Sequence, residues 1–158
     1  MILKALKPWH IKGALWELGC GTGNVGHFLK NHSYDIVGIE PSPVAAELSS
    51  KKGILTLRGA IQDFELPKKS LNGIGPFDIL EHLDERTEFL KYLHDLLSPE
   101  GILVVTVPAS QLLWSQSDVL AGHKLRYTSR VLKTDLTNAG FKILYMKKMF
   151  APPFFRFY

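Results

Sequence analysis

The sequence predicts an α/β fold: a doubly wound, mostly parallel sheet with helices on both faces. Two observations predict it. Short apolar runs alternate with segments whose apolar residues recur at helical spacing, which is typical of parallel strands joined by crossover helices. A glycine-rich stretch, Gly19 to Gly23, directly follows the first apolar run, where such folds place a sharp turn into a helix.

The first half of the chain carries clear signals for the ends of its elements. Its predicted elements are a strand at 14–18, a helix at 24–32, a strand at 35–40, a helix ending near residue 52 and a strand at 54–57. Ser42 is a good N-cap and Pro43 suits the first helical position, so the second helix is expected to start there. Gly53 is expected to end that helix, because glycine readily adopts the left-handed conformation found after helix ends.

The second half alternates in the same way, with one weak strand. Its predicted elements are a strand at 71–76, a helix at 86–97, a turn at 99–101, a strand at 102–107, a helix capped by Thr128 and ended by Gly140, and a sixth strand at 141–149. The strand at 71–76 is weak because Asn72, Gly73 and Gly75 disfavour strands. The continuous apolar and β-branched run at 102–107 predicts a central strand, buried on both faces.

Size and composition favour one domain over residues 1–158. The chain has 158 residues, of which 46% are hydrophobic, so it can bury a core. A single cysteine excludes a disulfide framework, and no apolar run approaches the roughly 20 residues of a membrane helix. We therefore expect a cytoplasmic protein with no transmembrane segment. In residues 110–158, Lys and Arg outnumber Asp and Glu by 8 to 2, which indicates either a solvated basic face or an anionic partner.

The glycine loop predicts a ligand site. Glycines after a buried strand let the backbone approach a ligand, and the following helix points free N–H groups at it. Residues 21–26 also match the dinucleotide pattern G-x-G-x-x-G, although such a match alone is weak. Glu17, just before the loop, would repel a pyrophosphate and attract the ammonium and sulfonium groups of S-adenosylmethionine. Glu40 ends the second strand, where a carboxylate can accept both ribose hydroxyls of an adenosyl group.

Taken together and in order, these motifs resemble those of class I S-adenosylmethionine-dependent methyltransferases, over about residues 2–150. The stretches that carry the resemblance are Glu17–Gly23, Gly38–Ser42, Asp78–Leu83, Pro99–Pro108 and Ala139–Phe141. The resemblance implies a Rossmann-like methyltransferase fold, methyltransferase activity, and S-adenosylmethionine as cofactor with S-adenosylhomocysteine as product.

The resemblance also implies roles for individual residues. The residues expected to bind the cofactor are Glu17, Gly19, Cys20, Gly21, Gly23, Asn24, Glu40, Pro41, Ala60, Ile61, Gln62 and Phe77. The glycine loop would line the methionine moiety with Glu17 near its amino group, Glu40 would bind the ribose, and Phe77 would lie near the reacting methyl group. Residues 59–63 align with the segment that contacts adenine. Many relatives have an acid where Ala60 stands, so Gln62, Asp63 or a backbone N–H must serve there instead.

A hydroxyl acceptor benefits from a base that removes its proton, and the candidates are His82 and His123, with Asp118 as a further one. On a helix, Asp78, Glu81 and His82 would share one face and could hold Mg²⁺ or Zn²⁺, with His123 as a distant fourth ligand. Certain small-RNA and quinone O-methyltransferases use a similar cluster. Relatives with this Glu-His pair often carry no metal, so packing and capping roles are the favoured interpretation.

The stretch at 122–128 indicates the acceptor. It is similar to the Gly-His-x-x-Arg-Tyr-Thr stretch of methyltransferases encoded near polysaccharide and lipid-sugar genes. Lys124 and Arg126 could bind a phosphate or carboxylate, or Arg126 and Tyr127 could simply hold the loop on the following helix. We expect O-methylation of a small, anionic or sugar- or lipid-linked acceptor. No basic stripe with interleaved aromatics indicates nucleic acid.

Several alternatives stay open at this point. The chain could be truncated at both ends, because the helical lead-in is short and no seventh strand is found, and a homodimer could complete it. The aromatic tail, with Phe154, Phe155, Phe157 and Tyr158, would cover the core or touch a lipid-linked substrate. The competing functions are a non-catalytic cofactor-binding or partner subunit and an NAD-dependent oxidoreductase.

Overall fold

The computed structural model of the chain describes residues 2–148, and a five-stranded sheet forms its centre. The strands are β1 (Leu15–Leu18), β2 (Ile36–Glu40), β3 (Leu55–Arg58), β4 (Leu71–Pro76) and β5 (Leu97–Leu103). Their order across the sheet is β3-β2-β1-β4-β5, and all neighbouring pairs are parallel. Strand order therefore reverses beside β1, as in doubly wound folds.

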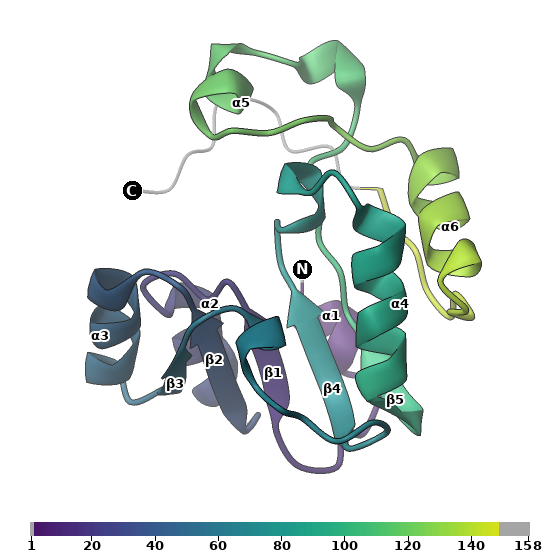
Figure 1. Cartoon of the computed structure of the whole chain (residues 1–158). Coiled ribbons are helices and arrows are strands. Elements are labelled where there is room, and N and C mark those ends of the chain that lie inside the picture. The colour runs from purple at the N-terminus through teal and green to yellow at the C-terminus, as the bar shows by residue number, and fades with distance from the viewer. Residues whose placement is uncertain (1, 149–158) are drawn as a thin grey trace.

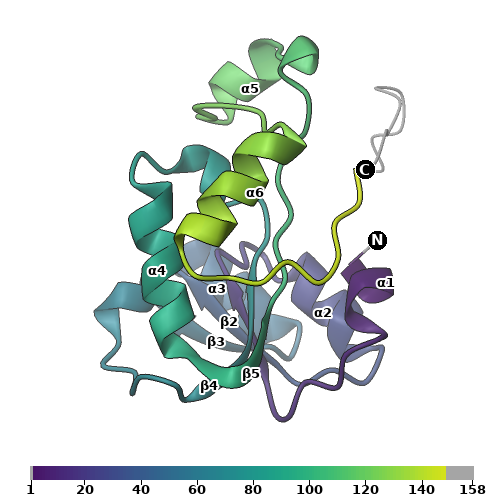
Figure 2. The same cartoon turned by 90° about the vertical axis from the view of Figure 1, so that its right-hand side faces the viewer.

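Helices cover both faces of this sheet (Figures 1 and 2). The α-helices are α1 (Ile2–Leu6), α2 (Asn24–Lys30), α3 (Pro43–Lys51), α4 (Arg86–Leu96), α5 (Gln116–Leu120) and α6 (Ser129–Asn138). Short 3₁₀ helices are η1 (Ile61–Asp63), η2 (Leu80–His82) and η3 (Gln111–Leu113). Figure 2 shows α1 and α2 on one side of the sheet and α4 on the other, with α6 packed beside α4. The predicted fold class is confirmed.

Two apolar clusters sandwich the sheet. On the α1–α2 face, Leu15 of β1 packs with Leu29 of α2 and Ile36 of β2. On the α4 face, Leu18 and Ile74 pack with Leu93. The two helix starts predicted from capping residues are confirmed, because the Ser42 and Thr128 hydroxyls accept hydrogen bonds from the third following backbone N–H groups. No helix among residues 2–148 is long and apolar enough to cross a bilayer.

The end of the sheet differs from the prediction in two ways. The strand predicted as central and buried at 102–107 is instead the edge strand β5, which starts at Leu97. The predicted turn at 99–101 is an irregularity inside that strand, where the β4–β5 register shifts. Beyond Leu103 the chain leaves the ladder, apart from one isolated bridge between Phe77 and Thr106.

The sixth strand predicted at 141–149 is absent over residues 141–148, and residue 149 lies outside the described part. Phe141 and Ile143 pack instead on the cluster between α4 and α6, so their apolar side chains find neighbours without a ladder. The aromatic tail after Phe150, with its predicted covering role, lies outside the described residues.

Candidate active site

The loop between β1 and α2 turns on three glycines in the left-handed region. Gly19, Gly21 and Gly23 have φ values of 60°, 53° and 75°. A Cβ at Gly23 would lie 2.9 Å from the backbone of Ser49, so α3 closes one side of the loop. A Cβ at Gly21 would meet nothing within 4 Å. The loop is therefore crowded behind Gly23 and open at Gly21, which leaves room for a ligand there.

Glu40 links the end of β2 to this loop. Its Oε2 atom accepts a hydrogen bond from the backbone N–H of Gly21 at 2.8 Å, and its Oε1 atom accepts one from the N–H of Ser42 at 2.8 Å. The carboxylate thus lies at the backbone amide that a pyrophosphate would need in a dinucleotide site. It still has free lone pairs for ribose hydroxyls.

Glu17 lies beneath α2 and not in the open part of the loop. Its side chain is 3% exposed, and a Cβ at Gly26 would lie 2.6 Å from its Oε2 atom. Gly26 therefore lets α2 pack closely on the carboxyl group. Burial raises the pKa of Glu17 to about 7, partly offset by a hydrogen bond from the backbone of Gly26. Because burial favours the protonated form of Glu17, repulsion of a pyrophosphate at this loop is expected to come mainly from Glu40.

The remaining residues expected at the loop and at the end of β2 lie as follows. The thiol of Cys20 is buried, 3.6 Å from the Ser49 hydroxyl, so only its backbone borders the open side. Asn24 accepts a hydrogen bond from the Lys52 ammonium group through its side chain. Pro41 is exposed beside Glu40.

The segment expected near adenine forms a tight turn at η1. The backbone N–H of Ala60 donates a hydrogen bond to Oδ2 of Asp63 at 2.7 Å. Asp63 thereby brings a carboxylate next to the position where relatives carry an acid. Ile61 is buried in the core, whereas Gln62 is exposed. Of the substitutes considered for the missing acid, Asp63 is the carboxylate that the structure brings to Ala60.

After β4 the chain touches the glycine loop. Phe77 is buried among the residues of the α1–α2 face. A Cβ at Gly19 would lie 2.3 Å from Cδ1 of Ile79, so Ile79 packs directly on the loop. Asp78 has a left-handed φ of 54°, and its carboxylate accepts a hydrogen bond from the Thr106 hydroxyl at 3.1 Å. The expected helical face of Asp78, Glu81 and His82 is wrong, because the short η2 helix starts only at Leu80.

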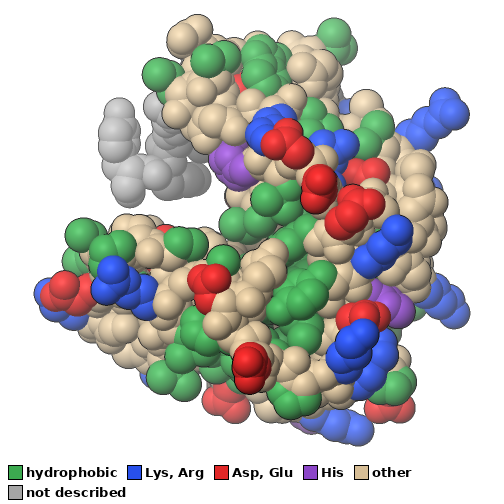
Figure 3. Space-filling model, in the orientation of Figure 1, with side chains coloured by type: hydrophobic (Ala, Val, Ile, Leu, Met, Phe, Trp, Pro, Cys, Tyr) green, Lys and Arg blue, Asp and Glu red, His purple; other side chains and the backbone are tan. Residues whose placement is uncertain are grey.

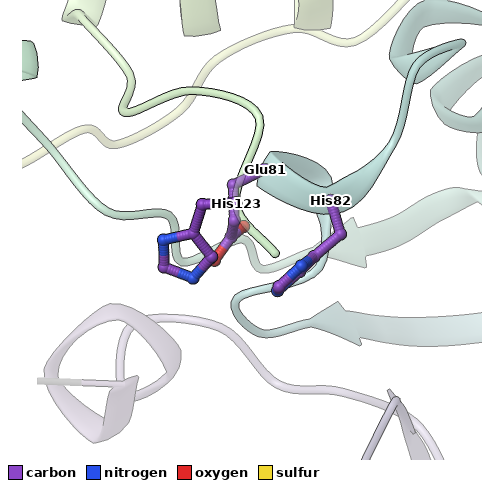
Figure 4. Close-up of side chains that lie close together, drawn as sticks. All are labelled: Glu81, His82 and His123. Atoms are coloured by element: carbon purple, nitrogen blue, oxygen red, sulfur yellow. The ribbon is translucent and has the colours of Figure 1, made fainter. Parts of the chain in front are cut away.

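Two residues beyond Ile79, Glu81 begins a second cluster with His82 and His123 (Figure 4). One ligand atom from each of the three side chains lies within 4.8 Å of the others, and the two imidazole rings are 4.9 Å apart. Three of the four side chains expected from the sequence to share a metal site are thus close together, with His123 nearer than expected, whereas Asp78 bonds to Thr106 instead. Glu81 is fully buried, with neither carboxylate oxygen hydrogen-bonded, and burial raises its pKa to about 7.

Asp118 holds His123 in place. Its Oδ1 atom accepts hydrogen bonds from Nδ1 of His123 and Nε of Arg126, both at 2.8 Å, and Oδ2 accepts one from Nη2 of Arg126 at 3.0 Å. These bonds, those of Arg126 above all, hold the pKa of this buried carboxyl well below its usual range. Asp118 therefore accepts hydrogen bonds as a carboxylate that stays ionised, and it is a poor general base. Sequence spacing alone could not pair residues 118, 123 and 126 across a loop.

The cations expected to bind an anionic acceptor already have partners. Arg126 bonds to Asp118, and Lys124 forms an ion pair with Asp84. Tyr127 is buried and its backbone N–H donates to Pro108, which holds the loop on the end of the sheet. The structure thus supports the alternative in which Arg126 and Tyr127 fix the loop.

Both groups of residues lie at the carboxyl ends of the strands, where open α/β sheets bind ligands. Figure 3 shows the molecule hollowed between the part that carries α3 and the part that carries α5. A separate cavity of about 640 Å³ lies at the amino ends of the strands. It is lined by residues 7–11 and 32–35, which precede β1 and β2. That cavity is remote from the glycine loop and plays no part in the site.

The fold is the Rossmann-like type found in an S-adenosylmethionine-dependent methyltransferase of known structure. Residues 9–145 match the model of a methyltransferase domain family, so the chain belongs to that family. It is 35% identical over 92 residues to an uncharacterized methyltransferase of Oceanobacillus iheyensis, covering 56% of this chain and 43% of the relative. It is 25% identical over 120 residues to the mitochondrial ubiquinone biosynthesis O-methyltransferase of Schizosaccharomyces pombe, covering 70% and 43%.

The fold agrees with solved structures. A SAM-dependent methyltransferase of Thermotoga maritima superposes with a TM-score of 0.73 at 26% identity, covering 90% of this chain and 70% of that one. The matched region spans less than half of the length of the two curated relatives. S-adenosylmethionine is the cofactor of this family. The open space at Gly21 and the carboxylate of Glu40 fit such a cofactor.

Proposed function

We propose that this chain transfers the methyl group of S-adenosylmethionine to a hydroxyl group of a small acceptor. The observation that carries the proposal is the contact between Ile79 and Gly19, which joins the cofactor loop to the Glu81–His82–His123 cluster. A methyl group held at the loop would therefore lie close to side chains that can activate an acceptor.

The cofactor half of the proposal rests on the loop and on Glu40. The backbone of Gly19 to Gly23 would line the methionine moiety, and Glu40 would accept the ribose hydroxyls. Asp63, beside Ala60, would face the adenine amino group. Glu17 would not contact the cofactor from the open side of the loop, because it is buried against Gly26 of α2. A nicotinamide dinucleotide fits less well, because the carboxylate of Glu40 stands at the Gly21 amide.

The acceptor half rests on His82 and His123, the catalytic residues of this proposal. Methyl transfer is an in-line displacement with a neutral leaving group, so alignment carries much of the catalysis. A hydroxyl acceptor must also lose its proton, and the imidazole cluster is the group placed to promote that loss. O-methylation is supported by the likeness to the S. pombe O-methyltransferase. An anionic, sugar-linked or lipid-linked acceptor, a cytoplasmic location and a homodimer stay predictions.

The test is methyl transfer measured as S-adenosylhomocysteine release against a panel of hydroxylated aromatic acids, phosphorylated sugars and dicarboxylic acids. We expect turnover with at least one hydroxyl acceptor and a loss of at least tenfold in kcat for His123→Ala. Glu47→Ala is the matched control, because Glu47 lies exposed on α3 and pairs with Lys51 of the same helix. Cofactor binding without turnover on any acceptor would instead support the non-catalytic subunit.

A further inference from the structure

We propose that Glu81, His82 and His123 bind one divalent transition-metal ion, with Zn²⁺ as the reference ion. The inference deepens the proposed function, since it says how the same cluster would activate an acceptor, and therefore rests on it. The ligand atoms come from two separate segments, η2 and the loop after α5, and lie within 4.8 Å of one another (Figure 4).

Glu81 supplies the first argument. Its side chain is fully buried, and neither Oε1 nor Oε2 has a hydrogen-bond partner among the described residues. A buried carboxyl group without partners is costly, so native structures rarely keep one unless something else satisfies it. The nearest cationic candidate, Nε2 of His123, stands 4.0 Å from Oε1, too far for a hydrogen bond. A cation between these side chains would satisfy the carboxylate.

The two histidines supply the second argument, because each already has a hydrogen-bond acceptor on Nδ1. Nδ1 of His123 donates to the Asp118 carboxylate at 2.8 Å, and Nδ1 of His82 donates to the backbone carbonyl of Gly122 at 3.3 Å. Since a carbonyl or carboxylate oxygen can only accept, Nδ1 is the donor in both rings, and Nε2 is the ring nitrogen left to bind a metal. Metal-bound histidines are oriented in this same way, by a carboxylate or backbone carbonyl on the ring nitrogen that does not bind the metal.

The orienting groups are themselves fixed. Asp118 is buried and held by Arg126 and by the N–H of Ser115. The backbone N–H of Lys124 donates to the carbonyl of Glu81 at 2.8 Å, which ties the His123 loop to η2. Ligands bound to a metal at about 2.0–2.1 Å in a tetrahedron lie roughly 3.3 Å apart. Small side-chain rotations from the present separations would therefore suffice.

The donor set selects the class of ion. Two imidazole nitrogens and one carboxylate oxygen suit zinc, iron or similar ions, whereas magnesium and calcium favour sites made of oxygen atoms. Three protein ligands leave coordination positions for an acceptor oxygen, as in catalytic zinc sites. A bound ion would polarise that oxygen and ease loss of its proton. The Nε2 lone pair of His123 would then hold the ion, so this role replaces that of a free base.

Metal binding is measured directly, with Co²⁺ as a spectroscopic probe and Zn²⁺ in competition with a chromophoric chelator on chelator-treated protein. We expect one ion per chain, and at least tenfold weaker binding in Glu81→Gln and in His123→Ala. Asp78→Asn and His32→Ala are the matched controls and should bind like the wild type. Asp78 is an acid near the cluster that bonds elsewhere, and His32 is exposed at the end of α2.

Folding of each variant is checked by S-adenosylhomocysteine binding, which uses the glycine loop and not the cluster. Wild-type protein that binds S-adenosylhomocysteine but no Zn²⁺ would overturn the metal site and leave the proposed function standing. Zn²⁺ affinity unchanged in both Glu81→Gln and His123→Ala would likewise overturn it. Metal bound with no binding of S-adenosylhomocysteine would instead contradict the proposed function and uphold the metal site alone.

Discussion

Oδ1 of Asp118 accepts a hydrogen bond from Nδ1 of His123 at 2.8 Å, five residues further along the chain. The same carboxylate receives two hydrogen bonds from Arg126, so one buried acid fixes both the imidazole and the loop that carries it. The loop thus combines a structural ion pair with a candidate catalytic side chain. Its stability and its chemistry are expected to fail together when Asp118 is changed.

Asp118→Ala should lower the free energy of unfolding by about 3 kcal/mol, because it leaves the half-buried Arg126 guanidinium without its partner. Urea denaturation measures the effect. Asp84→Ala is the control, since Asp84 is the exposed partner of Lys124, and it should cost no more than about 1 kcal/mol. Equal losses in the two variants would show that burial of the Asp118 pair is not the cause.

Glu17 makes stability depend on pH. Its folded-state pKa of about 7 lies above the ordinary value of 4.5, so the folded state prefers the protonated acid. The stability from this group is complete below about pH 4.5 and is lost as the pH rises through 7. By pH 8 the loss is on the order of 3 kcal/mol. Glu17→Gln should therefore stabilise the protein relative to wild type at pH 8, but not at pH 4.5.

Denaturant unfolding at the two pH values measures this difference. Glu65→Gln, at an exposed acid outside the core, serves as the control and should leave the pH dependence unchanged. A Glu17→Gln variant as pH-dependent as the wild type would mean that Glu17 is ionised in the folded protein at neutral pH.

Gly21→Ala separates ligand binding from folding. A methyl group there meets no protein atom within 4 Å, so the cost in stability is limited to the left-handed backbone, about 1–2 kcal/mol. The same methyl group would occupy the open side of the loop, so affinity for S-adenosylhomocysteine should fall at least tenfold. Gly13→Ala carries the same backbone strain in equally open surroundings, away from the loop, and should leave affinity unchanged. Calorimetry and urea denaturation give the two readouts, and equal affinities in both variants would argue against a ligand at Gly21.

Local signals in the sequence predicted most of the fold. The starts of α3 and α6 follow from the N-caps Ser42 and Thr128, and β4 forms at 71–76 despite its glycines. Because Gly73 and Gly75 leave room for Ile11 and Phe77, their lack of a side chain is a packing requirement there and not a defect. Propensity counts such glycines against a strand because it does not include the side chains that pack on them, such as Ile11 on Gly73.

The errors share a cause of the same kind. The apolar run at 102–107 suggested a central strand, yet where a strand stands in a sheet depends on what pairs beside it. No sixth strand forms over residues 141–148, because the apolar side chains of Phe141 and Ile143 are instead packed on α4 and α6. At the site, Glu40 and the glycine loop followed from motif order. His123 was expected near Glu81 only as a distant ligand, because its close approach and its bond to Asp118 depend on the path of the loop after α5, which no spacing encodes.

The central claim is that the glycine loop and Glu40 hold S-adenosylmethionine. Calorimetric titration of wild type, Glu40→Ala and the exposed-acid control Glu47→Ala with S-adenosylhomocysteine, beside NADH, tests it most directly. We predict binding of S-adenosylhomocysteine and not of NADH, unchanged in Glu47→Ala and weakened at least tenfold, about 1.4 kcal/mol, in Glu40→Ala. Absence of S-adenosylhomocysteine binding in the wild type, or equal affinity in the folded Glu40→Ala variant, would contradict the claim.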